Sequence, residues 1–198
     1  MLLFAPYFGY KPNRFEAEVG RVMEIIINSL YSDRDVFLRE LVSNAADACD
    51  KKRFLSITSD GESESDLVEP EIKIKCDSVS QSLIIEDSGV GMTKDEVVNN
   101  LGRIAQSGTK KFLEALGSGN ADVNLIGQFG VGFYSGFLVA DKMIVQTKSM
   151  QPNSKTYTWE STADSSFTVS EGDDDVEPFE SGSGTRIILE LKEVCYCL

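Results

Sequence analysis

Histidine is absent from this chain of 198 residues. Its absence excludes Ser-His-Asp and Cys-His catalysis, and every metal site that uses an imidazole ligand. Any acid–base chemistry must then use a carboxylate or a lysine. Cysteine is scarce as well. With four cysteines, no C-x-x-C pair and 41% apolar residues, the chain is not expected to depend on a disulfide framework. No apolar run approaches the roughly 20 residues of a membrane span.

Basic residues are outnumbered, with 19 Lys and Arg against 32 Asp and Glu and a net charge of −13. Such a surface repels phosphodiester backbones and anionic membranes, so neither nucleic acid nor membrane is expected as a partner. A nucleotide remains compatible, because a local nest of backbone amides can outweigh the global charge. The chain contains neither G-x-x-x-x-G-K-[ST] nor G-x-G-x-x-G after a strand, which excludes P-loop and Rossmann sites.

Hydrophobic periodicity predicts helices in the first half and mainly strands in the second. Helices are expected over residues 15–30, 36–53, 93–105 and 110–116, with Thr93 as N-cap and Glu96 completing a capping box. Strands are expected over residues 71–78, 142–149, 155–161, 165–171 and 184–193, and residues 82–92 read as a strand entering a glycine turn. This order predicts an α+β two-layer sandwich dominated by antiparallel strands. Residues 1–14 are predicted as an arm and residues 15–198 as a single domain.

The helix expected over residues 36–53 carries a narrow polar stripe beside its apolar arc. The stripe spans roughly 60° of the helical wheel and consists of Glu40, Asn44, Asp47 and Lys51. The arc consists of Phe37, Leu38, Leu41, Val42, Ala45, Ala48 and Cys49. One interpretation is a solvated rim with i,i+4 pairs. The other is the wall of a ligand site, in which Asn44 offers an oxygen to a metal ion and Glu40 faces the reacting group.

Two glycine-rich segments bear on this choice. In "DSGVGM", Asp87 ends a strand directly before Gly89 and Gly91, where it can accept a hydrogen bond from the exocyclic amine of a base. A single G-x-G also occurs in many ordinary tight turns. In "GQFGVGF", three glycines precede an expected helix, and bare amides at a helix start make a phosphate cradle.

Four blocks in this order resemble the N-terminal ATP-binding domain of the ninety-kilodalton heat-shock chaperone family: "FLRELVSNAADACDK", "DSGVGMT", "NNLGRIAQSGT" and "IGQFGVGFYSGFLVADK". The resemblance runs from about residue 15 to about residue 192. The wider group includes type II topoisomerase ATPase domains, sensor histidine kinases and mismatch-repair ATPases. The resemblance implies a Bergerat-type ATPase fold, in which a mixed, mostly antiparallel sheet is covered on one face by helices. It also implies a mobile lid at about residues 102–132.

The resemblance implies a site for ATP or ADP with Mg²⁺. Glu40 would be the general base, Asn44 would ligate Mg²⁺, and Asp87 would bind the adenine amine. Further contacts to base, sugar and phosphates are implied at Asp47, Lys51, Gly91, Met92, Asn100, Gly130, Val131, Gly132, Phe133 and Thr185. Gln106 stands where many members have a lysine, which removes one possible phosphate-facing cation.

The implied function is that of an ATP-dependent molecular chaperone of the stress response. ATP binding would close the lid and promote dimerisation through the N-terminal arm, and slow ATP hydrolysis would reopen the lid, in a cycle that helps unfolded client proteins to fold. The chain is expected to be a fragment of a longer homodimeric protein that also binds co-chaperones. By itself the domain is expected to be a monomer with weak ATPase activity, because in this family a following domain supplies an arginine to the γ-phosphate.

Three alternatives belong to other classes. A topoisomerase-like or mismatch-repair ATPase would act on DNA, which the acidic charge disfavours. A histidine kinase needs a phosphoacceptor histidine, and a binding module would hold nucleotide without turnover. "IKIKCD" and "YTWESTADSSFTV" favour the endoplasmic-reticulum branch of the chaperones, with the cytoplasm or another organelle as the alternative.

Overall fold

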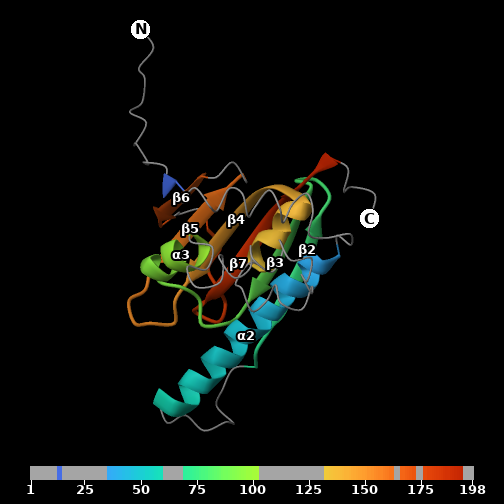
Figure 1. Ribbon diagram of the computed structural model, residues 1–198. Helices are drawn as coiled ribbons and strands as arrows, with labels where there is room; N and C mark the ends of the chain where they lie inside the picture. The colour runs from blue at the N-terminus through green and yellow to red at the C-terminus, as the bar shows by residue number, and fades with distance from the viewer. Residues whose placement is uncertain are drawn as a thin grey trace, which may run out of the picture.

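The computed structural model describes residues 13–14, 35–59, 69–102, 132–162, 166–172 and 176–193. These residues form a seven-stranded sheet with helices packed against one face (Figure 1). All strand pairings among the described residues are antiparallel, where a mixed sheet was expected. The α+β two-layer prediction is confirmed. The helices expected at 15–30 and 110–116, nearly all of the lid and most of the arm lie outside the described residues.

The strands from β2 to β7 follow the predicted segments closely, whereas β1 lies in the stretch predicted as an arm. The strands are β1 (Asn13–Arg14), β2 (Ile72–Asp77), β3 (Ser82–Asp87), β4 (Ala140–Lys148), β5 (Thr156–Ser161), β6 (Ser166–Glu171) and β7 (Gly184–Leu191). Their order across the sheet is β1-β6-β5-β4-β7-β3-β2. β7 therefore does not extend the β4–β5–β6 meander, but inserts between β4 and β3.

In the described part of the chain, three helices lie on the same face of the sheet: α2 (Val36–Ser59), α3 (Lys94–Leu101) and the 3-10 helix η5 (Gly132–Leu138). α2 continues past the predicted end at Arg53, since neither glycine nor proline interrupts it before its last residue. α3 ends at Leu101 because Gly102 caps it, with the Gly102 amide donating to the Val98 carbonyl at 3.1 Å. The prediction that this helix extends to residue 105 is wrong at Gly102.

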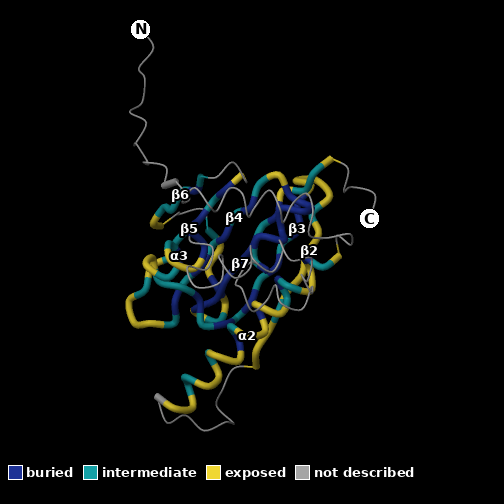
Figure 2. Tube along the Cα trace, viewed as in Figure 1, coloured by how far each residue is buried: buried dark blue, intermediate teal, exposed yellow. Residues whose placement is uncertain are grey.

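The core lies between the helices and the sheet, in the dark-blue centre of Figure 2. Strand alternation points one side chain in two toward the helices, among them the fully buried Ile85, Val145 and Trp159. Leu41 of α2 meets them with no exposed surface, and burying such a side chain stabilises the fold by about 1.5–3 kcal/mol. Leu38 departs from the predicted apolar arc, since it is 37% exposed.

Candidate functional site

One cross-strand row on the helix-covered face is polar, whereas the row beside it is apolar. The register pairs Asp87 with Thr185 and Thr185 with Thr147. These three residues are only 6%, 8% and 0% exposed, respectively. The neighbouring row contains Ile85 and Ile187. Burying polar groups costs free energy unless they are hydrogen-bonded. A buried row of three polar side chains is therefore a candidate for a binding site.

The Asp87 carboxylate is the charged member of this row. The Gly89 amide donates to its Oδ1 at 2.9 Å. Burial raises the pKa of Asp87 to about 6, against the lowering influence of the Gly89 and Thr185 amides and of the Lys52 charge. The nearby Glu86 charge also contributes to this raised value of the Asp87 pKa. At neutral pH the group is therefore mainly ionised, and a carboxylate retains lone pairs for a further donor.

Thr147 organises the rest of the row. Its Oγ1 accepts a hydrogen bond from the Met92 amide at 3.0 Å and donates to the Gly184 carbonyl at 2.9 Å. It also lies 3.1 Å from Oγ1 of Thr185. Thr147 thus fixes the positions of Met92 and Thr185. The sequence analysis did not single it out. The sequence did contain a signal. Thr147 is a threonine on the inward face of a strand whose other inward residues are apolar.

The turn after β3 is held between α2 and β4 by close backbone contacts. A Cβ on Gly89 would lie 2.7 Å from the Ala48 backbone, and the Val90 amide donates to the Ala48 carbonyl at 3.1 Å. Gly91 has φ +61°, and a Cβ there would lie 1.9 Å from the Lys148 carbonyl oxygen. Both glycines are needed where two backbones meet, so the predicted glycine turn is confirmed.

The second glycine segment meets the same helix two turns earlier. A Cβ on Gly132 would lie 2.6 Å from Oε2 of Glu40, so the start of η5 rests beside this carboxylate. The Glu40 side chain is 14% exposed and contacts Arg39 Nη2 at 3.3 Å. Glu40 and Ala48 are separated by about 12 Å along the helix axis. α2 therefore lies against two acidic positions. The buried Asp87 belongs to the turn that contacts Ala48, and Glu40 lies beside the glycine-rich start of η5.

Residues 20–183 match the family described as histidine kinase-, DNA gyrase B-, and HSP90-like ATPase. The chain belongs to this ATPase family. Membership implies a site for ATP or ADP, and it accounts for an α+β fold of this kind.

Several curated relatives are heat-shock chaperones by name. An endoplasmin homolog of Hordeum vulgare is 54% identical over 180 residues, which are 90% of this chain and 22% of the relative. The mitochondrial heat shock protein 90-6 of Arabidopsis thaliana is 51% identical over 183 residues, which are 90% of this chain and 22% of that protein. The chaperone protein HtpG of Desulfitobacterium hafniense (strain Y51) is 45% identical over 181 residues, which are 90% of this chain and 28% of that protein.

These relatives confirm the resemblance to the ninety-kilodalton heat-shock chaperone family. The chain spans between about a fifth and about three-tenths of their length. Their names point to more than one compartment, because a chloroplastic heat shock protein 90-5 of Arabidopsis thaliana also matches, at 51% identity. Among the described residues, no helix is long and apolar enough to cross a membrane.

The structure places the predicted ATPase residues in two groups and a rim. Asp87, Gly91, Met92 and Thr185 meet at the polar row, beside the middle of α2, while Glu40 and Gly132 meet about two turns earlier on this helix. Asn44, Asp47 and Lys51 are exposed on α2 and Asn100 is exposed on α3. Phe133 is half-buried, and its ring contacts the Trp159 ring edge-on, with 5.4 Å between the ring centroids. Gly130 and Val131 lie outside the described residues.

Asp47, Lys51 and Asn100 have no hydrogen bond to the other predicted residues within the described part of the chain. Their exposure fits both a solvated rim and the wall of an open site. Two glycine-rich segments contact α2 about two turns apart, one at Glu40 and one at Ala48. This pattern favours the wall, because a simple rim would not need them.

Proposed function

We propose that this domain binds an adenine nucleotide along α2, with the base at Asp87 and the phosphates beside Glu40 and Gly132. The observation that carries the proposal is the buried Asp87 carboxylate in a polar row beneath the glycine turn. Family membership supplies the ligand class. The polar row supplies the contacts that a purine requires.

At the adenine end, the Asp87 carboxylate accepts a hydrogen bond from the exocyclic amine of the base. The Thr185 hydroxyl completes the polar edge, oriented by Thr147 at 3.1 Å. Half-buried Met92 offers a flexible thioether against the flat ring. Glycine at position 91 keeps the turn narrow enough for the backbone to approach the ligand.

At the phosphate end, Glu40 takes the proton of the attacking water on its carboxylate. The Gly130, Val131 and Gly132 amides are assigned to the phosphates from the sequence. Asp47, Lys51, Asn100 and Phe133 line the remaining rim.

The donor chemistry of α2 fits Mg²⁺. The described residues contain no cluster of three or more His, Cys, Asp or Glu side chains that would cage an ion without the nucleotide. Mg²⁺ commonly binds through one or two protein oxygens, with phosphates and water completing its shell. The exposed Asn44 amide oxygen is one such ligand. Bound with the nucleotide, the ion neutralises phosphate charge.

For the whole protein we propose an ATP-dependent chaperone. Chaperone and heat-shock names among the relatives and the charge of −13 support this role over an ATPase that acts on DNA. In this proposal the full-length protein is a homodimer that binds clients and co-chaperones. Closure of a lid at about residues 102–132 and contacts of the arm at 1–14 follow ATP binding.

We also propose the endoplasmic reticulum as its compartment. Endoplasmin homologs of Hordeum vulgare and Arabidopsis thaliana, at 54% and 52% identity, support this location. Imaging of the tagged full-length protein tests it, and co-localisation with mitochondria or plastids would reject it.

Calorimetry of the purified domain with Mg²⁺ and ADP tests the nucleotide site. We expect binding by the native domain, and a loss of affinity on the order of 100-fold in Asp87→Asn, because the amide presents a donor toward the base. Asp141→Asn, which changes an exposed acid on β4, is the matched control and should bind normally.

Glu40→Ala separates catalysis from binding. This variant should bind ADP like the native domain, whereas ATP turnover by the full-length protein should disappear. Absence of any heat with ADP, or native affinity in Asp87→Asn, contradicts the proposed site.

A further inference from the structure

Lys52 lies on the side of α2 that packs against the glycine turn, and the residue is half-buried. Its Nζ donates to the Ser88 carbonyl at 3.0 Å and to the Ser181 carbonyl at 3.2 Å. Burial lowers the pKa of Lys52, and the nearby Asp87 charge opposes this shift. A cation is costly to bury unless it is hydrogen-bonded. The two carbonyl contacts therefore indicate a specific placement.

Ser88 and Ser181 belong to two segments that are far apart in sequence. Ser88 follows Asp87 in the glycine turn, and Ser181 belongs to the 176–183 loop, which leads into Thr185 at the start of β7. Ser183 Oγ donates to the Gly89 carbonyl at 2.9 Å, a second link between turn and loop. Lys52 thus ties α2 to both backbones that carry the polar row.

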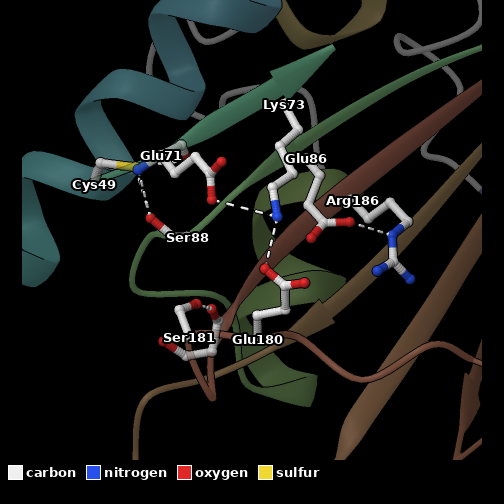
Figure 3. Close-up of polar contacts among 9 residues, drawn as sticks. Cys49, Glu71, Lys73, Glu86, Ser88, Glu180, Ser181 and Arg186 are labelled. Atoms are coloured by element: carbon white, nitrogen blue, oxygen red, sulfur yellow. Dashed lines mark hydrogen bonds and ion pairs between the residues drawn. The ribbon is translucent and has the colours of Figure 1, made fainter. Parts of the chain in front are cut away.

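The loop is also held by cations that project from the opposite face of the sheet (Figure 3). Arg186 is 7% exposed, donates to the Glu177 carbonyl at 3.1 Å and to Glu86 Oε2 at 2.5 Å. Lys73 pairs with Glu180 at 2.7 Å. Lys52 supplies the corresponding contact from the helix side, so the loop is fastened from both faces around Asp87 and Thr185.

The titratable groups around Asp87 come from every neighbouring element. They are Glu86 on β3, Cys49 and Lys52 on α2, Glu71 and Lys73 at β2, and Glu180 in the loop. Burial raises the pKa of Cys49, so its thiol is neutral. Glu86 pairs with Arg186, and Lys73 pairs with Glu71 and Glu180. In its described contacts Lys52 meets carbonyl oxygens and no carboxylate, which leaves its charge to act on Asp87.

We propose that Lys52 is a positioning residue of the nucleotide site, which holds the Asp87 turn against the 176–183 loop and places a positive charge near the carboxylate that receives the base. The inference rests on the proposed function, because the contact between Asp87 and adenine is itself part of that proposal.

A pH dependence distinguishes this role from simple structural support. An adenine amine needs a carboxylate acceptor, so affinity falls as pH drops through the Asp87 pKa of about 6. Lys52 is one of the groups that lower this pKa. Removing its charge moves the fall in affinity to higher pH, whereas a purely structural defect weakens binding equally at every pH.

The experiment measures Mg-ADP affinity by calorimetry from about pH 5.5 to about pH 8 in four variants. Lys52→Met should bind about tenfold more weakly at neutral pH, and its midpoint should lie above that of the native domain. Lys52→Gln keeps a donor without the charge, so it should share the raised midpoint with a smaller loss of affinity. Lys52→Arg should restore the native midpoint. Lys75→Met removes an exposed cation from β2 and should match the native domain.

Titration of the Asp87 carboxyl carbon by NMR in the nucleotide-free domain gives a readout that needs no ligand. The Asp87 midpoint should rise in Lys52→Met and Lys52→Gln and stay in place in Lys52→Arg and Lys75→Met. An unchanged Asp87 midpoint in both neutral variants overturns the proposal. Failure of the native domain to bind ADP would contradict the proposed function, while the NMR titration would still decide whether Lys52 controls Asp87.

Discussion

Among the glycines that the structure describes, Gly91 is the one at which a side chain would clash most severely. Its φ of +61° is left-handed, and a Cβ would lie 1.9 Å from the Lys148 carbonyl oxygen. Gly182 has a similar φ of +77°, and a Cβ there would meet nothing within 4 Å. The two glycines therefore separate the cost of a left-handed backbone from the cost of a steric clash.

Gly91→Ala should lower the free energy of unfolding by about 3 kcal/mol or more, because β4 or the turn must move. Gly182→Ala should cost only about 1–2 kcal/mol, from backbone strain alone. Urea denaturation of both variants measures the difference. Equal midpoints would mean that the turn after β3 is not held against β4 as described.

Asp87 gives the free domain a specific dependence of stability on pH. Its pKa is raised in the folded state, to about 6, so the folded chain binds this proton more tightly than the unfolded chain. Its contribution to the free energy of unfolding is therefore present at low pH and lost as pH rises through about 6. Relative to Asp87→Asn, the native domain should lose about 1 kcal/mol of stability between about pH 5 and about pH 7.5.

Urea denaturation without nucleotide, at several pH values, measures this difference. Asp141→Asn, on the exposed part of β4, should show no such trend against the native domain. A pH-independent difference between Asp87→Asn and the native domain would show that Asp87 titrates normally.

Residues of the candidate site differ in how far sequence alone could identify them. Asp87, Gly89 and Gly91 lie in one short segment. The sequence of this segment alone predicted a glycine turn and a carboxylate acceptor beside it. Thr147 and Lys52 are distant from that segment in sequence, and only the β4–β7 register and the packing of α2 bring them to it. Their roles depend on tertiary contacts, which no local pattern contains.

At the scale of the element, α3 shows a local signal that tertiary structure preserved. Thr93 Oγ1 accepts the Glu96 amide at 3.4 Å, and Glu96 Oε2 accepts the Thr93 amide at 2.8 Å, as the capping box predicted. Thr93→Ala should destabilise the domain by about 1 kcal/mol in thermal or urea unfolding. Thr58→Ala is the control, because Thr58 lies inside α2 and its hydroxyl donates to the Phe54 carbonyl. Equal stability of the two variants would argue against the cap.

η5 shows the opposite case. A glycine-rich start and an apolar run predicted a helix after residue 132, but the chain forms a 3-10 helix whose residues are almost all buried. Gly136 lies against the sheet, where a Cβ would come within 2.8 Å of the Met143 sulfur. Close packing around η5 favours the tighter 3-10 backbone, and hydrophobic periodicity does not distinguish this backbone from an α-helix.

At the scale of the whole molecule, layer composition was predictable and strand order was not. Strict alternation predicted β2, although none of its residues is buried, and strand-like runs bounded by turn residues predicted β3 to β7. Hairpin spacing placed β4, β5 and β6 together, and the structure pairs them so. Nothing in the spacing of β7 indicates that it pairs with both β3 and β4.

That central position of β7 has a consequence for synthesis on the ribosome. Until residue 191 has left the exit tunnel, β3 and β4 each present an open edge to the same empty slot. The nascent polypeptide can form its early hairpins, but it cannot join them into one sheet. Translation must therefore pass residue 191 before the two halves of the proposed nucleotide pocket meet, and until then the facing edges of β3 and β4 stay open to pairing with other strands.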